Sequence, residues 1–390
     1  MKKSIPVFLF LTLILSSCKR DKEIIPAETY TEAQNNFGTA GTDNLLDGLY
    51  FSYGEYIGIG STDGAGAGMN DGWLVRFNWN GEPSWQQTFG GSDNDYFNSL
   101  IKTTDGGLLI TGTSASNSAG LEDVWLLKLN NSGLVQWEKR FGGASTDLGM
   151  NSVELNDGSF IVSATTLSKG QGSFDHWLLK VDASGNLKKD TTYGTTAYEA
   201  YAFIKQKTDG NFFIGGVYES GGNRDFQVME INSNLDSLNK FNFGSADYEE
   251  AKNIVVLSDG NYLISGHSAG FGHLEHNFYA VKFDNDGNKI WENNYGTALH
   301  EGSENTLVLG NGKILLTGRS NGNGTNNEDL LYVVIDENGN EQRKFFMGGT
   351  NNDAGNKSFV YGNSVFSLGR SEATAGNANG WILRQSIKKF

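Results

Sequence analysis

Histidine is the residue type in this sequence that is best suited to acid–base or metal chemistry near neutral pH. Four of the five histidines lie within one short stretch, at His267, His273, His276 and His300. Glu275 and Glu301 stand beside them, so imidazole and carboxylate groups could together ligate a transition metal. A His-x-x-His pair in a loop fixes no ligand geometry, however. We therefore expect no metal site and no cofactor.

Aromatic residues accompany the histidines in predicted loops and at the starts of predicted strands. These are Tyr96, Tyr198, Tyr201, Tyr248 and Phe271. Aromatic rings in such places either stack on sugar rings or pack the loops themselves. The candidate ligand-binding residues are therefore Tyr96, Tyr198, Tyr248, Phe271, His273, His276, His300 and Glu301.

Two short motifs match chemical signatures without the surroundings that those signatures need. Gly266-His267-Ser268-Ala269-Gly270 fits G-x-S-x-G, whose serine is a nucleophile only on a strand-to-helix turn, and no helical pattern follows it. Asp284-Asn285-Asp286-Gly287 resembles the opening of a calcium loop but lacks the glutamate at its twelfth position. We expect a repeat strand at the first motif, a turn at the second, and no catalytic residue.

The elements that must position the candidate residues recur along the chain. Each repeat opens with an aromatic residue or methionine followed by glycine. The seven copies begin at intervals of 52, 52, 52, 50, 52 and 52 residues, at Phe37, Phe89, Phe141, Tyr193, Phe243, Tyr295 and Met347. Each complete repeat contains a turn such as Asp105-Gly106, two apolar runs such as residues 108–110 and 124–127, and a second turn before its last strand.

This pattern predicts four short strands per repeat and an all-β fold. Units of four strands with a period of about 40–50 residues are typical of propeller blades. A β-solenoid, the alternative, usually has a shorter period and no reason to stop at seven copies. The predicted fold is a seven-bladed β-propeller of four-stranded antiparallel blades. Trp73, Trp125, Trp177 and Trp381 share one position in the third strand, where we expect them to pack between blades.

The two ends of the repeat array predict a closed ring. The seventh repeat, from Met347 to Phe390, is about one strand short, and residues 29–36 occupy the place of a last strand before the first repeat. An N-terminal strand at residues 29–36 would complete the last blade and remove both exposed edges. We therefore expect residues 29–390 to form one propeller and the propeller to be a monomer.

Two polar positions recur in register with the repeats. An acid follows six residues after each repeat start, at Asp43, Asp95, Asp147, Glu199, Glu249, Glu301 and Asp353. A second polar residue precedes each third strand, at Asp71, Asp123, Asp175, Asp225, Asn277, Asp329 and Asn379. Their repetition in every blade favours a structural role, in which carboxylates accept backbone N–H bonds and hold the loops. The alternative is a negative rim that gathers cations.

Charge and cysteine content exclude several classes of protein. The chain has a net charge of −15, so it lacks the cationic surface with which proteins bind nucleic acid. Its single cysteine, Cys18, excludes an internal disulfide and a four-cysteine zinc site.

The first residues resemble the signal peptide of a bacterial lipoprotein. Lys2 and Lys3 precede an apolar stretch at residues 7–15, and Leu15-Ser16-Ser17-Cys18 resembles a lipobox. The resemblance implies cleavage after residue 17, lipidation of Cys18 and a tether at residues 18–28. It implies a lipid anchor in the outer membrane, at either its periplasmic face or the cell surface.

The repeat unit, with Trp85 and the Phe89-Gly90-Gly91-Ser92 step, resembles the propeller repeats of lipid-anchored Bacteroidota proteins. That resemblance implies a fold and no particular activity. The leading hypothesis is a non-catalytic binding or scaffold lipoprotein that captures a glycan or a protein partner on its loop face. The alternative is a polysaccharide lyase or hydrolase that uses the acids and histidines of that face.

Overall fold

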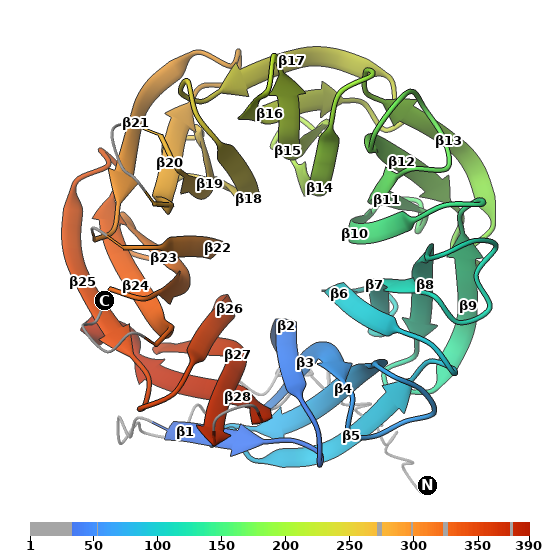
Figure 1. The fold of residues 1–390 in the computed structure, drawn as a ribbon, viewed down its shortest axis with the longest axis horizontal. Coiled ribbons are helices and arrows are strands. Elements are labelled where there is room, and N and C mark those ends of the chain that lie inside the picture. The colour runs from blue at the N-terminus through green and yellow to red at the C-terminus, as the bar shows by residue number, and fades with distance from the viewer. Residues whose placement is uncertain (1–32, 53, 271–274, 298, 323–326, 375–376) are drawn as a thin grey trace, which may run out of the picture.

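The computed structural model describes residues 33–52, 54–270, 275–297, 299–322, 327–374 and 377–390. These residues form seven four-stranded antiparallel sheets arranged in a ring (Figure 1). The prediction of a seven-bladed β-propeller is confirmed. The one helical element of the described chain is a 3-10 turn, η1 (Ile387–Lys389), and none of its helices has the length and apolar character to cross a membrane.

Each blade consists of four strands that follow one another from the channel to the rim. Blade 1 comprises β2 (Asp43–Ser52), β3 (Glu55–Thr62), β4 (Asp71–Asn78) and β5 (Pro83–Phe89). Blade 2 comprises β6 (Asp95–Lys102), β7 (Leu108–Ser114), β8 (Asp123–Leu129) and β9 (Val135–Phe141). Blade 3 comprises β10 (Asp147–Glu154), β11 (Phe160–Thr166), β12 (Asp175–Val181) and β13 (Leu187–Tyr193). Blade 4 comprises β14 (Glu199–Gln206), β15 (Phe212–Ser220), β16 (Asn223–Ile231) and β17 (Ser237–Phe243).

The remaining blades repeat this order. Blade 5 comprises β18 (Glu249–Val256), β19 (Tyr262–Ser268), β20 (Asn277–Phe283) and β21 (Lys289–Tyr295). Blade 6 comprises β22 (Glu301–Leu309), β23 (Lys313–Ser320), β24 (Asp329–Asp336) and β25 (Glu341–Met347). Blade 7 comprises β26 (Asp353–Tyr361), β27 (Ser364–Thr374), β28 (Asn377–Ser386) and β1 (Ala33–Phe37).

The apolar runs of the sequence form the two middle strands of each blade. In blade 2, every residue of β7 and β8 is buried, whereas β9 at the rim is mostly exposed or half-buried. Trp125 of β8 is 1% exposed, and its ring stacks on Phe97 with centroids 4.7 Å apart. Both residues belong to a core that also contains Ile57 and Leu74 of blade 1. The prediction that these tryptophans pack between blades is confirmed for Trp125.

The connections divide between two faces of the ring. Ser116, in the loop between β7 and β8, and Gly91, in the loop after β5, both donate hydrogen bonds to Asp95, so these two kinds of loop share one face. We call it the loop face. Tight turns such as Asp105-Gly106 lie on the opposite face, and Gly106 adopts a φ of +83° that glycine tolerates without strain. Each outermost strand therefore ends at the loop face.

The N-terminal strand closes the ring. β1 pairs antiparallel with β28, with Gln34 opposite Leu383 and Asn36 opposite Trp381. This pairing gives blade 7 its fourth strand, as the sequence predicts, and covers the edge of β28. The expected strand at residues 29–36 overlaps β1 from residue 33 onward, and residues 29–32 lie outside the described residues.

Every innermost strand carries a β-bulge at the same register. In β18 the pairing with β19 skips between Ala251 and Asn253, which leaves Lys252 as the extra residue. A Cβ on Gly266 of the facing strand would overlap the carbonyl oxygen of Glu250 at this bulge, so the position requires glycine. Gly266 is thus explained by the close approach of two strands, and the strand expected at the G-x-S-x-G motif is confirmed.

Candidate functional site

The seven acids that stand six residues after each repeat start hold the loops, and we call them the ring acids. All seven ring acids, from Asp43 to Asp353, are at most 2% exposed. Asp95 accepts a hydrogen bond from the backbone N–H of Gly91 at 2.8 Å and another from the Ser116 hydroxyl at 2.7 Å. The same bond from the N–H four residues earlier recurs at Asp43, Asp147, Glu199, Glu249 and Asp353. Burial and these bonds support the structural interpretation, because a buried carboxylate cannot form an exposed rim.

Each ring acid lies beside the second polar position of the preceding blade. The backbone N–H of Asp353 donates to the Glu328 carbonyl at 2.7 Å, which brings the Asp353 and Asp329 carboxyl groups together. Asp329 is 1% exposed, and neither of its oxygens has a hydrogen-bond partner among the described residues. Burial and the charge of Asp353 raise the pKa of Asp329 to about 6.

A second group of polar and aromatic side chains gathers on the loop face over blades 4 to 6. We call it the Tyr–His cluster. Its members come from the loops before β14, β18 and β22 and from neighbouring strands, and they are Tyr198, Tyr201, Arg224, Tyr248, Glu250, Lys252, His267, His276 and His300.

Arg224 joins blades 4 and 5 within the Tyr–His cluster. The centre of its guanidinium group lies 4.1 Å from the Tyr198 ring centroid and 5.4 Å from that of Tyr248. Its Nε donates to the Glu219 carboxylate at 3.1 Å. Blade 4 can place Arg224 here because Gly221 and Gly222 make a tight hairpin between β15 and β16, where blades 1 to 3 have a longer loop. A guanidinium group within about 6 Å of a ring centroid is attracted to the ring, so Arg224 links the two tyrosines.

Three histidines extend the Tyr–His cluster toward blade 6. The ring centroid of His276 lies 5.1 Å from His267, 5.0 Å from His300 and 5.2 Å from Tyr248. His300 Nδ1 lies 3.7 Å from the Glu275 carboxylate. The Nδ1 atoms of His267 and His276 have no hydrogen-bond partner among the described residues. The sequence stretch rich in histidine thus forms a contiguous imidazole array.

Burial keeps two of these imidazoles, those of His267 and His276, uncharged at neutral pH. It lowers the pKa of His267 to about 3, and burial together with His300 lowers the pKa of His276. Burial raises the pKa of Tyr198 and Tyr248 above the ordinary tyrosine value, and Glu250 raises that of Tyr248 further. Tyr198 and Tyr248 therefore stay protonated and His267 and His276 stay neutral, so these side chains meet a ligand as uncharged polar groups, which suits ligands that carry hydroxyl groups.

The other side of the Tyr–His cluster reaches the channel. Glu250 accepts a hydrogen bond from the Tyr248 hydroxyl and pairs with Lys252 at 2.5 Å. The Lys252 ammonium lies 4.8 Å from the Tyr201 ring centroid, and the Tyr201 ring lies 6.5 Å from Tyr198. Tyr201 has a φ of +57°, an uncommon conformation for an aromatic residue that costs backbone energy. Such local strain is often found at functional sites.

The candidate ligand-binding residues predicted from the sequence fall into three groups in the structure: four that lie together, one in blade 2, and three that the cluster does not include. The structure brings Tyr198, Tyr248, His276 and His300 together. Tyr96 lies in β6 of blade 2, where burial, Glu122 and Asp95 raise the pKa of its hydroxyl.

The other three proposed residues do not contribute to the cluster as it is described. Glu301 is fully buried and accepts hydrogen bonds from the hydroxyls of Thr297 and Ser320, so it holds a loop and is no ligand contact. Phe271 and His273 lie outside the described residues.

Sequence reasoning missed Arg224, Glu250 and Lys252. The available signal was the Gly221-Gly222 pair, which interrupts the regular loop length just before Arg224. Within the described residues, no group of three or more histidine, aspartate, glutamate or cysteine side chains is arranged to hold a metal ion. Ser268 donates to Glu249 at 2.7 Å inside a regular antiparallel strand, as expected for a structural serine.

Solved structures of other propellers resemble this one. No protein-family model and no curated protein sequence matches the chain. The crystal structure of polysaccharide lyase Uly1 aligns with a TM-score of 0.56 and 9% identity over 94% of each chain. Puromycin hydrolase aligns with a TM-score of 0.57 and 12% identity over 87% of this chain, which spans only 53% of the hydrolase chain.

A third likeness is to Chaetomium thermophilum Sqt1, solved with the N-terminus of ribosomal protein L10. It aligns with a TM-score of 0.51 and 11% identity over 90% of this chain and 100% of that one. At identities this low the shared feature is the architecture, because one fold hosts many unrelated functions. These likenesses, with the seven closed blades, identify the chain as a β-propeller.

Proposed function

We propose that the protein is a non-catalytic binding module that captures a glycan through the Tyr–His cluster. The observation that carries this proposal is the half-exposed array of Tyr198, Arg224, Tyr248, His276 and His300 on the loop face. It combines aromatic surface, tyrosine hydroxyls and imidazole groups, most of them on loops that a rigid scaffold supports. Function placed on loops over a repeat scaffold is the usual arrangement in such proteins.

Replacing His276 and His300 together by alanine is expected to weaken glycan binding by about tenfold or more, because two hydrogen-bonding groups are lost. Binding to a panel of purified polysaccharides and oligosaccharides would be measured by calorimetry. The matched control is Tyr96→Ala, which removes an aromatic residue from blade 2 outside the Tyr–His cluster and should leave binding unchanged. Equal glycan affinity in wild type and the double variant would contradict the proposal. Binding of a peptide but of no glycan would indicate a protein partner instead.

A polysaccharide lyase is the second candidate. Its support is His276, an imidazole with a lowered pKa whose ring centroid lies 5.2 Å from that of Tyr248, a tyrosine that stays protonated. A base and an acid of these types could remove a proton from a sugar acid and protonate the leaving oxygen. Glu250 is less suited to be a hydrolase acid: burial raises its pKa, but the charge of Lys252 and hydrogen bonds from Lys252 and Tyr248 outweigh burial and hold it below the ordinary value. Unsaturated products from any tested glycan, lost in His276→Ala, would establish the lyase.

We also propose that Cys18 carries a lipid that anchors the protein in the outer membrane. Cys18→Ala is expected to remove the lipid and to release the protein from the outer-membrane fraction. Fractionation and intact mass would be compared with wild type. A Cys18→Ala protein that stays in the membrane fraction with the mass of wild type would contradict lipidation.

A further inference from the structure

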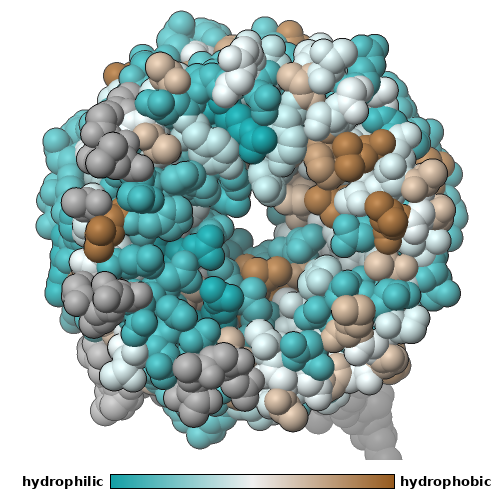
Figure 2. Space-filling model, in the orientation of Figure 1, coloured by the Kyte–Doolittle hydropathy of each residue, from teal (hydrophilic) through white to brown (hydrophobic). Residues whose placement is uncertain are grey.

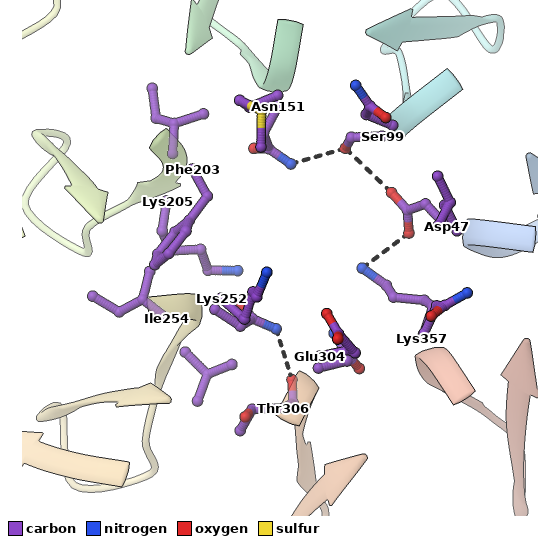
Figure 3. A pocket seen from close by; sticks show the side chains of 18 of the residues that line it. Asp47, Ser99, Asn151, Phe203, Lys205, Lys252, Ile254, Glu304, Thr306 and Lys357 are labelled. Atoms are coloured by element: carbon purple, nitrogen blue, oxygen red, sulfur yellow. Dashed lines mark hydrogen bonds and ion pairs between the residues drawn. The ribbon is translucent and has the colours of Figure 1, made fainter. Parts of the chain in front are cut away.

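The centre of the ring is a channel lined by all seven innermost strands. Its cavity of about 760 Å³ is bounded by β2, β6, β10, β14, β18, β22 and β26. Figure 2 shows the opening at the middle of the ring, and Figure 3 shows the side chains that point into it. The cavity is large enough for a monosaccharide or the end of an oligosaccharide chain.

Blade 4 breaks the repeat at two positions of the channel wall. Four residues after each ring acid, six blades have a polar residue, namely Asp47, Ser99, Asn151, Asn253, Asn305 and Lys357, whereas blade 4 has Phe203. Six residues after each ring acid, six blades have an apolar residue, namely Leu49, Ile101, Val153, Val255, Leu307 and Phe359, whereas blade 4 has Lys205. A scaffold role alone does not require this exchange, because the other blades close the ring without it.

The carboxylates of the channel already have cationic partners. Asp47 pairs with Lys357 at 3.0 Å and accepts hydrogen bonds from Ser99 and from the backbone N–H of Leu100. Glu304 lies 3.8 Å from Arg319. Lys252 is likewise engaged, with Glu250.

Lys205 remains without an ion-pair partner among the described residues, although it projects into the cavity (Figure 3). The Lys205 side chain is open to the solvent of the cavity, where crowding by the channel wall and the positive charge of Lys357 lower the pKa of its ammonium group. Asp47, Glu304, Lys205, Lys252 and Lys357 together give the channel lining one excess positive charge in a chain of net charge −15. An oxyanion beside Lys205 would neutralise that excess.

We propose that the channel binds an oxyanion, as carboxylate, sulfate or phosphate, with Lys205 as the principal contact, and that the glycan captured by the protein is therefore acidic. This names the ligand class of the function proposed above and rests on it, since Tyr201 and Lys252 belong both to the channel wall and to the Tyr–His cluster. The acidic group would lie beside Lys205, toward the far end of β14, and the following sugars would extend through the channel past Tyr201 and Lys252 to the cluster. Neutral glycans lack the group that Lys205 would recognise.

The test compares three probes that separate the charge from the sugar: glucuronate, glucose and inorganic sulfate, titrated by calorimetry at low ionic strength. Wild type is expected to bind glucuronate and sulfate but not glucose, and tenfold higher salt should weaken both interactions. Lys205→Val is expected to weaken glucuronate binding by about tenfold or more, and Lys205→Arg should retain it. The control is Lys188→Val, which removes an exposed lysine of the outer strand β13.

The Lys205→Val variant should fold normally. Valine already occupies the equivalent position in blades 3 and 5 as Val153 and Val255, so its melting temperature is expected to equal or exceed that of wild type. Equal glucuronate affinity in wild type and Lys205→Val would overturn the proposal, as would a wild type that binds none of the anions. Binding of sulfate without glucuronate would reject a uronic acid and assign the site to a sulfated saccharide. Loss of anion binding in Lys205→Val while the cluster variants bind glycans like wild type would uphold the channel site and reject the cluster.

Discussion

A chain that begins at Gly38 is expected to be less stable than the full protein by about 3 kcal/mol or more and to associate with itself. Deleting β1 removes the hydrogen bonds between residues 33–37 and β28. It also removes the Phe37 ring, whose centroid lies 5.6 Å from that of the buried Trp73, and loss of such a ring typically costs several kcal/mol. The edge of β28 would then be open to a second chain. Thermal unfolding and light scattering would measure both effects.

The matched control is a chain that begins at Lys22, which lacks the signal peptide and the cysteine but keeps β1. It should unfold at the temperature of the longer protein and remain a monomer. If the two shortened chains unfolded at the same temperature, β1 would contribute nothing to stability and the closure would be incidental.

Asp329→Asn is expected to stabilise the protein at pH 8 by about 2 kcal/mol. The wild-type carboxyl is buried beside Asp353, and its pKa of about 6 lies above the value of an unfolded aspartate. Because this pKa is higher in the folded protein than in the unfolded chain, the free energy of unfolding is largest at low pH, where the carboxyl group is protonated in both states. It falls as the pH rises through about 6, because the buried group then ionises. Asparagine cannot ionise, and Asn277 and Asn379 already occupy the same repeat position in blades 5 and 7. Urea unfolding at pH 4 and pH 8 would show a gain that is large only at the higher pH.

Asp95→Asn provides the contrast. Asp95 accepts hydrogen bonds from Gly91 and Ser116, so an amide that presents N–H groups to these donors should destabilise the protein at both pH values. A loss of stability at pH 8 in Asp329→Asn would show instead that the ionised Asp329 carboxylate is satisfied, and would contradict the argument from burial.

The fold could be predicted from the sequence because the same strand pattern recurs in seven repeats. A single Asp-Gly turn or apolar run is ambiguous, but the repeated spacing from Phe37 to Met347 gives the number of blades and the strands in each. The short last repeat predicted the closing strand by simple arithmetic. The bulges of the innermost strands were not foreseen, because Lys252 differs in type from its counterparts and the bulge glycines look like ordinary strand interruptions.

The same reasoning predicted only part of the candidate site. Comparing the repeats separated residues that recur in every blade from residues that do not. Tyr198, Tyr248, His276 and His300 could therefore be identified as residues outside the repeat pattern. Repetition also explained the ring acids, yet Glu301 was still included as a ligand because its burial cannot be seen in the sequence. Arg224 escaped notice because its role depends on which two rings the fold places on either side of it.

The direction of β1 has a consequence for how the molecule would stand on a membrane. Because outermost strands end at the loop face, β1 begins at Ala33 on the opposite face, and the preceding chain joins the propeller there. A lipid at Cys18 would therefore hold that opposite face toward the bilayer. The Tyr–His cluster and the adjoining mouth of the channel would point outward, away from the lipid surface and toward polymers that approach from solution.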